Sequence, residues 1–349
     1  MFGENERISQ RQLGRQAVLV FLGLFVIIAP SVATMRGRLG MISCILGTLL
    51  ALCYLFYLSR MTGAYRNPEK NLGKVCSKIV ACIYSLYLIL SGGFIVRLLS
   101  EIVKKYLITN IHLWLICGLI VLVAAWGTGW NIQRRARIAE VAYPVIIAGF
   151  ALLLIFAAVK VPLENLKMSE PLSAASVARG TYQYFAGYSA IAVVPFIMDR
   201  VQRSASAGNR LMRSIVIVAV FTLVCLLVLG AAFGSQGIAY RRVPILDVMS
   251  GVNLPGEFLQ RFDIVWISLL LFVLLFAAGS TFFYANHLLE RVQIKKAHIP
   301  LALLVLVIAC ISYNGQSIVD IYAPALQYVC APVLLVLSLC MPLMQRRKK

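Results

Sequence analysis

Ten stretches of mainly apolar residues, each close to the length that crosses a bilayer, constrain this chain more than any other feature. A membrane-spanning helix needs about 20 mostly apolar residues in a row. Of the 349 residues, 61% are apolar and only 13% are charged, which places the chain among integral membrane proteins. The predicted crossings are 13–34, 39–59, 76–99, 109–128, 138–159, 180–198, 212–234, 262–286, 298–314 and 321–344.

The basic residues predict the orientation of these crossings. With both termini in the cytoplasm, the inner segments hold about two-thirds of the 33 Lys and Arg residues, as the positive-inside rule requires. The same rule accounts for the net charge of +20 without nucleic acid as a partner, and no soluble domain is predicted that could present a basic face to it. We expect a single transmembrane domain at 13–344, with a cytoplasmic segment at 1–12 and a basic tail at 345–349.

Two crossings carry the same interruption signal. Gly23 is followed by Pro30, and Gly187 is followed at a similar interval by Pro195. Irregular backbone survives inside a membrane only where it is buried in protein or lines a cavity, and transporters place broken helices at matching positions of two inverted repeats. The first and sixth crossings begin repeats of five, at about 13–159 and 180–344. The alternative is that glycine and proline are simply common in membrane helices, where glycine allows close packing.

The predicted fold is therefore all-α, with ten transmembrane helices in a five-plus-five inverted repeat and with helices 1 and 6 interrupted. At such breaks, freed backbone amides can hold a carboxylate and freed carbonyls can hold an ammonium group or a cation. Tyr184 and Tyr188 lie four residues apart and share a face if the helix continues, although tyrosines are also common at the membrane interface. The candidate ligand-binding residues are Leu22, Gly23, Leu24, Tyr184, Phe185, Ala186, Gly187 and Tyr188.

Charged residues near helix ends are candidates for structural or gating roles. Glu140 follows Arg137 by three residues, so the two could form an interfacial salt bridge. Asp199 ends the sixth crossing, either as a gate or anchor or as a solvated helix end. Ser280 and Thr281 could bind a cation, or could bond back to their own helix. The predicted structural and gating residues are Pro30, Arg97, Glu101, Arg137, Glu140, Pro195, Arg261 and Asp263.

Several motifs, in order along the chain, resemble the endospore germination permeases, the B-type membrane subunits of nutrient germinant receptors within the amino acid–polyamine–organocation (APC) superfamily. The motifs are ISQRQL (8–13), the Gly23–Pro30 interval, Arg97 with Glu101, RIAEVAYP (137–144), FAG (185–187), VPILDVM (243–249) and FLQRFDIVW (258–266). The resemblance implies a LeuT/APC-like fold, an amino acid or similar nutrient as ligand, and A-type and C-type receptor subunits as partners. It also makes Tyr87, on the third crossing, a candidate ligand-binding residue. Tyr188 departs from the family, whose members often carry an acidic residue at this position.

The sequence thus predicts a membrane subunit of a spore germinant receptor, in the spore inner membrane or the cell membrane, that binds a nutrient between helices 1 and 6 and signals germination. A proton- or sodium-coupled amino-acid transporter is the first alternative, and a passive scaffold or channel is the second. No P-loop, dinucleotide motif or nucleophile–base arrangement is present, so no enzymatic activity is expected. The nine cysteines form no CxxC pair, and we expect neither a metal site nor a cofactor.

Overall fold

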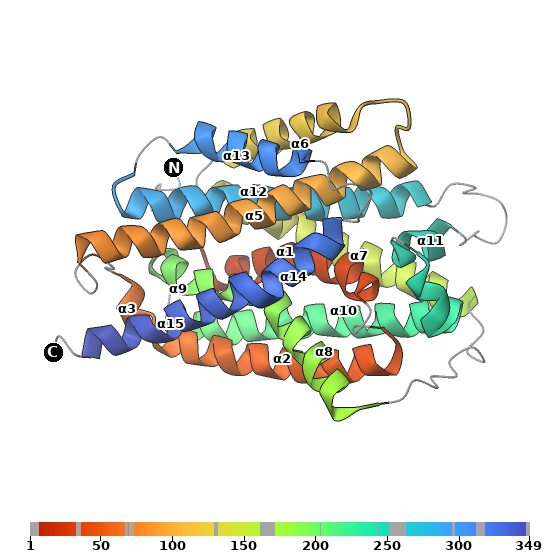
Figure 1. The fold of residues 1–349 in the computed structure, drawn as a ribbon, viewed down its shortest axis with the longest axis horizontal. Helices are drawn as coiled ribbons and strands as arrows, with labels where there is room; N and C mark the ends of the chain where they lie inside the picture. The colour runs from red at the N-terminus through yellow and green to blue at the C-terminus, as the bar shows by residue number, and fades with distance from the viewer. Residues whose placement is uncertain are drawn as a thin grey trace.

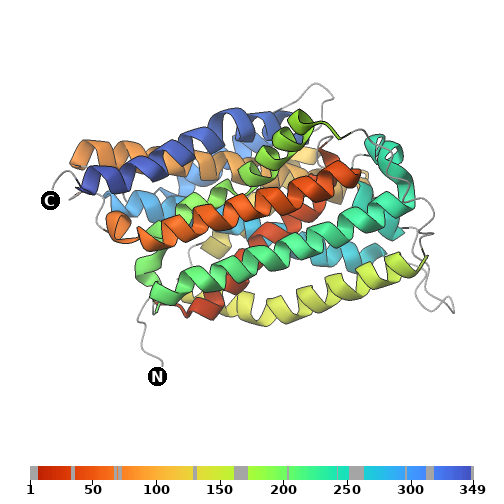
Figure 2. The same ribbon diagram turned by 90° about the horizontal axis from the view of Figure 1, so that it is seen from below.

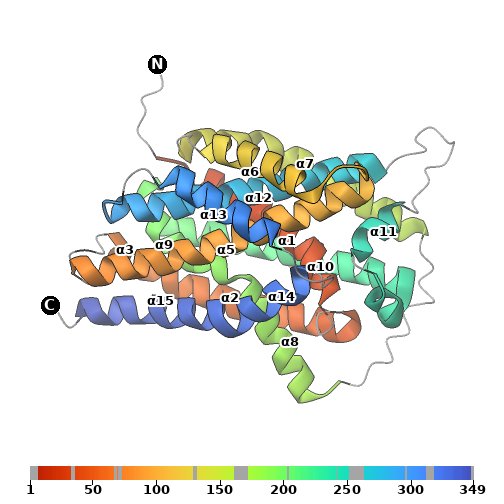
Figure 3. The same cartoon turned by 45° about the horizontal axis from the view of Figure 1, so that its top comes forward.

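The computed structural model is a bundle of helices that run along a common long direction (Figure 1). It describes residues 7–32, 36–66, 69, 73–128, 132–160, 172–202, 204–241, 243–250, 263–294, 297–311 and 318–346. Both termini lie toward the same end of the bundle in three views (Figures 1, 2 and 3). We call this end, where α1 begins and the last helix finishes, the terminal end.

The first half of the chain supplies five crossings. Its helices are α1 (Gln10–Ser31), α2 (Gly37–Arg60), the short α3 (Gly63–Arg66), α5 (Lys74–Tyr106), α6 (Leu113–Thr128) and α7 (Ile132–Lys160). The second half begins with a broken crossing made of α8 (Ala174–Gly187), η3 (Ser189–Val193), α9 (Val194–Ile197) and η4 (Met198–Arg200). It continues with α10 (Ser204–Ala239), α11 (Pro244–Ser250), α12 (Asp263–Arg291), α13 (His298–Cys310), α14 (Ile318–Ala325), η5 (Leu326–Cys330) and α15 (Ala331–Arg346).

The ten predicted crossings are confirmed in this arrangement. Seven helical segments of the described chain are long and apolar enough to span a membrane: 10–31, 37–60, 74–106, 132–159, 206–234, 264–291 and 318–342. The shorter apolar helices α6 and α13 and the broken segment 174–200 account for the other three. Most of the motif VPILDVM (243–249) lies in the short helix α11, whose Ile245 and Leu246 are buried.

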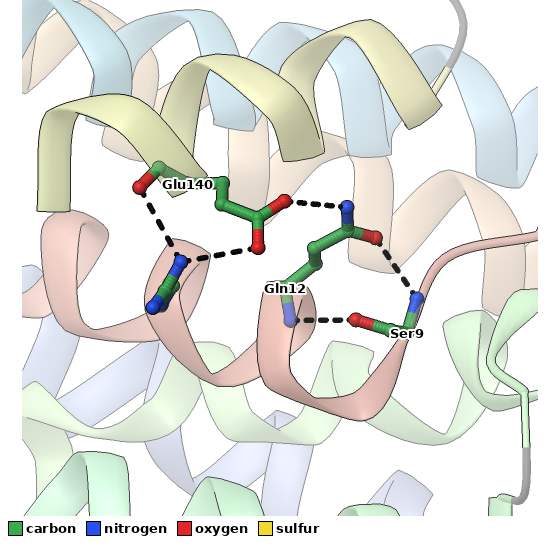
Figure 4. A network of polar contacts seen from close by, with 4 residues as sticks. Ser9, Gln12 and Glu140 are labelled. Carbon is green, nitrogen blue, oxygen red and sulfur yellow. Dashed lines mark hydrogen bonds and ion pairs between the residues drawn. The ribbon is translucent and has the colours of Figure 1, made fainter.

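The motif ISQRQL starts α1 through a capping box. The Ser9 hydroxyl accepts a hydrogen bond from the Gln12 backbone N–H at 3.2 Å, and the Gln12 side chain accepts one from the Ser9 N–H at 3.0 Å (Figure 4). This reciprocal pairing satisfies two of the backbone donors that a helix start leaves without a partner. Ile8, just before the cap, exchanges backbone hydrogen bonds of 2.9 Å with Arg200 and Gln202. The motif therefore ties the start of α1 to the end of the broken crossing.

Glu140 joins α7 to α1 rather than to its own helix. Its carboxylate accepts hydrogen bonds from Gln12 at 3.0 Å and from Arg15 at 3.2 Å (Figure 4). Arg137, the partner that the i,i+3 spacing predicted, is exposed on α7. The prediction of an Arg137–Glu140 pair was wrong because Arg15 approaches from the neighbouring helix, and a spacing rule within one helix cannot anticipate such a partner.

The predicted interruption of α1 was also wrong. Gln10–Ser31 is one α-helix through Gly23, and Pro30 lies one residue before its end. A Cβ at Gly23 would come within 2.7 Å of the Val273 side chain, so this glycine serves close packing against α12 rather than unwinding. Proline near the end of the helix removes a hydrogen bond only where the helix is about to stop.

Aromatic and ionic contacts close the bundle at its terminal end. Phe196 of α9 packs edge-on against Tyr65 and Tyr84, with ring centroids 5.1 Å apart in both pairs. The Tyr65 hydroxyl donates to the Ser338 carbonyl at 2.6 Å. Asp199, an exposed residue at the end of the broken crossing, forms an ion pair with Arg291 at the end of α12. These contacts connect segment 194–202, α3, α12 and α15 at the terminal end of the bundle.

Arg135, near the start of α7, is buried in the bundle. It donates to the Phe276 carbonyl at 3.2 Å and to the Ser280 hydroxyl, and its guanidinium lies 4.8 Å from the centre of the Phe276 ring. No carboxylate pairs with it among the described residues, and its Nε atom has no partner there. A buried cation without a counter-charge contributes packing more than electrostatic stability.

We expect Arg135→Met to change the free energy of unfolding by less than about 1.5 kcal/mol, because methionine fills most of the space without burying a charge. The Ser280 hydroxyl already donates to the Phe276 carbonyl at 2.7 Å, so neither group loses its last partner. Arg135→Ala leaves a cavity and is expected to cost about 2–4 kcal/mol. Thermal unfolding of the purified variants in detergent measures both, and equal losses would show that the charge itself is required.

Candidate ligand site

A central hollow lies between α1, α5, α12, the broken crossing and the last crossing. Its volume is about 80 Å³, and at about 10–15 Å³ per water position it accommodates roughly five to eight waters, or one small organic molecule in their place. No charged side chain of the described residues lines it. The lining residues are Val20, Phe21, Leu24, Phe25, Ile28, Ala29, Val32, Tyr87, Leu88, Ser91, Phe94, Ile95, Gln183, Gly187, Ala190, Thr281, Val319, Tyr322, Ala323, Leu326 and Gln327.

The sixth crossing breaks where it borders this cavity, as predicted. α8 ends at Gly187, Tyr188 forms a turn, and the backbone continues as a 3₁₀ helix from Ser189. Pro195 then stands near the start of α9. The change from i,i+4 to i,i+3 hydrogen bonds redirects backbone groups at mid-membrane, and α8 directs its C-terminal end, with its partial negative charge, toward the cavity. A hydrogen-bond donor on a ligand is favoured at that end.

The second irregular stretch belongs to the last crossing, not the first. Residues Leu326–Cys330 form a π-helical turn just after Pro324. Its Gln327 is buried and accepts a hydrogen bond from the Gln183 amide at 3.0 Å, and the Gln327 carbonyl accepts one from the Tyr182 hydroxyl at 2.5 Å. Gln183 and Gln327 both line the cavity. The two irregular helices therefore meet across the hollow through a pair of amide side chains.

Other neutral polar groups in the wall are paired with each other. The Tyr87 hydroxyl lies 3.0 Å from the Ser189 hydroxyl, and the Ser91 hydroxyl lies 2.7 Å from the Tyr322 hydroxyl. Thr281 donates to the Ala278 carbonyl of its own helix at 2.7 Å, and Ser280 bonds back in the same way, which confirms the second of the roles considered for these hydroxyls. The cavity thus offers an apolar wall with a few hydrogen-bonding groups, which is the usual composition of a small-molecule site.

Aromatic rings close two sides of the cavity. Phe25 stacks on Tyr188 with ring centroids 4.2 Å apart, and Phe94 stacks on Tyr322 at 4.0 Å. Phe21 also contacts the Tyr188 ring, at 5.5 Å. Tyr188 is buried behind the two phenylalanines and does not line the cavity. It shapes the site by supporting the rings that do.

Three of the predicted ligand-binding residues line the cavity: Leu24, Tyr87 and Gly187. The others lie in packed surroundings. Gly23 faces α12, Tyr184 faces α2 at Gly47, and Phe185 contacts the Tyr54 ring at 5.7 Å. Leu22 and Ala186 are fully buried, and neither they nor Tyr188 are among the lining residues.

Of the predicted structural residues, Arg97 and Glu101 form an ion pair of 2.7 Å within α5. Arg97 also donates to the Ala309 carbonyl at 3.1 Å, and so holds the end of α13. Arg261 lies outside the described residues. Asp263 begins α12, but its side chain is not described. Asp320 lies in the first turn of α14, where a carboxylate is favoured.

Sequence reasoning missed most of the cavity wall. Phe21 and Phe25 lie on the face of α1 that no glycine or proline marks. Gln327 is the one glutamine within the final apolar run of 321–344, and a buried amide there was the signal that could have located the site. Gln183 stood out as polar within its crossing, but it was not assigned a role.

Comparison with known proteins assigns the family. A profile of the family described as Spore germination protein matches residues 7–319. The chain belongs to this family of spore germination permeases. Spore germination protein YndE of Bacillus subtilis (strain 168) is 21% identical over 296 residues, which cover 80% of this permease and 81% of the relative. Spore germination protein B2 of the same strain is 25% identical over 220 residues, 56% of each chain, so the match spans about half of that relative.

Solved transporter structures share the fold of this permease. MhsT in complex with L-phenylalanine superposes with a TM-score of 0.71 at 13% identity, covering 95% of this chain and 88% of that one. Mhp1, a nucleobase-cation-symport-1 family transporter with bromovinylhydantoin bound, gives 0.68 at 14% identity, with coverage of 94% and 77%. A Na⁺-coupled sialic acid symporter gives 0.64 at 13% identity, with coverage of 98% and 77%. The predicted LeuT-like inverted-repeat fold is thus confirmed.

Proposed function

We propose that this permease is the membrane subunit of a nutrient germinant receptor and binds an amino acid or a similar small nutrient in the central cavity. The observation that carries the proposal is the position of the cavity, at the break of the sixth crossing in a chain of the spore germination family. A ligand that fits one arrangement of α8 and η3 better than another shifts the balance between them. That shift is passed to A-type and C-type partner subunits.

The proposal also includes the orientation of the chain and its membrane. The excess of Lys and Arg in the inner segments supports a cytoplasmic position for both termini, and the family supports the spore inner membrane as the proposed location. The cavity is lined toward the opposite end by Ile28, Val32 and Ile95, while the aromatic and ionic contacts described above fill the terminal end. In this proposal the nutrient arrives from the opposite, outer end.

Direct binding tests this function. Purified permease in lipid nanodiscs is titrated with the twenty amino acids and with simple sugars and nucleosides by isothermal titration calorimetry. Saturable binding of one compound or a small group is expected. Absence of binding, together with normal germination of a deletion strain on every nutrient when no paralogue is present, would contradict the proposal.

Coupled transport of the same ligand is the second candidate function, because proteins of this fold include transporters with L-phenylalanine or a hydantoin bound. Reconstitution distinguishes the two. Uptake of the labelled ligand into proteoliposomes that depends on a proton or sodium gradient would assign transport, whereas binding without uptake would assign sensing alone.

Gln327→Leu is expected to weaken ligand binding about tenfold, because it removes one amide of the Gln183–Gln327 pair from the cavity wall and with it a hydrogen-bonding group for the ligand. Leucine has a similar volume, so the fold should remain intact. Gln133→Leu, near the start of α7 and away from the cavity, is the matched control and should bind as the wild type does. Equal affinity in Gln327→Leu would exclude the amide pair from recognition.

A further inference from the structure

A second hollow lies at the terminal end of the bundle, beside α1. There α1 is flanked by α7 and α10 (Figure 2), and the hollow between the three helices has a volume of about 220 Å³. It shares no lining residue with the central cavity. Its lining residues are Arg11, Gly14, Arg15, Val18, Tyr143, Arg210, Arg213, Ser214 and Ile217. We call this hollow the arginine pocket.

Four arginines converge on the arginine pocket, and among the described residues one of them, Arg15, has a counter-charge. Arg15 pairs with Glu140 at 3.2 Å. Arg11, Arg210 and Arg213 are exposed, and none forms an ion pair with a carboxylate of the described chain. Like charges gathered around a concavity raise its positive potential and attract an anion. Guanidinium groups present paired donors that match phosphate oxygens.

Further from the terminal end, the lining of the pocket becomes apolar. Val18 follows Arg11 by seven residues along α1, and Ile217 follows Arg210 by seven residues along α10, so each lies about 10 Å deeper. The two helices touch between these levels, where the Ser214 hydroxyl donates to the Gly14 carbonyl at 2.9 Å. Tyr143 supports the side, with the Arg15 guanidinium 5.4 Å from the centre of its ring. A molecule that fits this pocket has a charged head and an apolar continuation.

The neighbouring surface faces lipid. Val216 and Val220 of α10 and Val141 and Val145 of α7 are 45–74% exposed, and in a membrane protein such apolar side chains contact hydrocarbon. The head-group layer on each side of a bilayer is about 5–8 Å thick. Arginines at that level would place the half-buried Ile217 beside the first part of the acyl chains, whereas Val18 is buried.

We propose that the arginine pocket binds an anionic phospholipid, with the phosphate held by Arg11, Arg210 and Arg213 and one acyl chain lying along Ile217. A soluble phosphate compound would offer the same anion, but it would leave the apolar floor exposed. The bound lipid would hold α1, α7 and α10 together beside the ISQRQL cap. Basic pockets between membrane helices recognise lipid head groups in this manner.

Native mass spectrometry of the purified full-length permease tests this site. Phosphatidylglycerol and phosphatidylcholine with the same acyl chains are the lipid probes, and glycerol 3-phosphate is the soluble one. We expect about tenfold tighter binding of phosphatidylglycerol than of phosphatidylcholine, and negligible binding of glycerol 3-phosphate. The triple variant Arg11→Gln/Arg210→Gln/Arg213→Gln should lose the preference for phosphatidylglycerol.

The matched control removes the same charge from the same end of the bundle. Arg60→Gln/Arg134→Gln/Arg137→Gln changes three exposed arginines outside the pocket and should keep the preference. Ile217→Trp retains every charge, fills the apolar floor, and should reduce phosphatidylglycerol binding about tenfold. Equal losses in both triple variants would reduce the effect to overall charge and overturn the site. Glycerol 3-phosphate binding as tight as that of the lipid would overturn the assignment to lipid.

Discussion

Permease carrying Gly187→Leu is expected to bind its nutrient at least about 100-fold more weakly than the wild type, a loss of about 2.7 kcal/mol. Gly187 is the last residue of α8 and lines the cavity. A Cβ there would come within 2.9 Å of the Phe25 ring, and the rest of a leucine side chain would extend into a volume of only about 80 Å³. The cavity would be filled by the protein itself.

Two comparisons separate loss of the cavity from loss of the fold. Gly118→Leu adds the same side chain at a position of α6 with open space around it, and it should leave binding unchanged. Gly187→Ala adds only one carbon against the far end of the Phe25 ring, which can shift, and an intermediate affinity is expected. Calorimetric titration gives the affinities, and thermal unfolding monitors the fold. Wild-type affinity in Gly187→Leu would place the nutrient outside the central cavity.

The number and positions of the crossings were predictable because they depend on length and polarity alone. Each of the ten apolar runs corresponds to a helical crossing, although α13 stops at Cys310 rather than at 314. The break of the sixth crossing was also predictable, since Gly187 is accompanied by Tyr182, Gln183 and Ser189, which need partners that lipid does not provide. Gly23 has the same interval to a proline but stands between Leu22 and Leu24. A glycine without polar neighbours indicates close packing as readily as unwinding.

The site itself was only partly predictable, because its wall is assembled from helices whose rotation the sequence does not reveal. Tyr184 lies one turn before Tyr188 and faces α2, whereas Gln183, one residue earlier, reaches the cavity. The π-helical turn at Leu326–Cys330 has no glycine to mark it. Such a turn depends on packing around Pro324 and Gln327, which becomes visible only when the last crossing is placed against α5 and α8.

Separating Asp199 from Arg291 is expected to loosen the terminal end of the bundle. Arg291 donates to Asp199 and, at 3.4 Å, to the Tyr65 carbonyl, and the side chains are 13% (Arg291) and 29% (Asp199) exposed. Arg291→Ala leaves the Asp199 carboxylate without this ionic partner, which costs about 1.5–3 kcal/mol after allowance for solvent. Amide hydrogen exchange in segment 194–202 should accelerate about 10- to 100-fold, as measured by mass spectrometry.

The exposed Arg137 provides the control, since Arg137→Ala removes an arginine from the same end without breaking an ion pair; exchange in 194–202 should stay at the wild-type rate. The double variant Asp199→Arg/Arg291→Asp restores the attraction with the charges swapped. Amide hydrogen exchange in 194–202 should therefore be slower in the double variant than in Asp199→Arg alone or in Arg291→Asp alone. If both single variants matched Arg137→Ala, the ion pair would not contribute to closure. Closure would then depend on the packing of Phe196 against Tyr65 and Tyr84, and on the backbone pairing of Ile8 with segment 200–202.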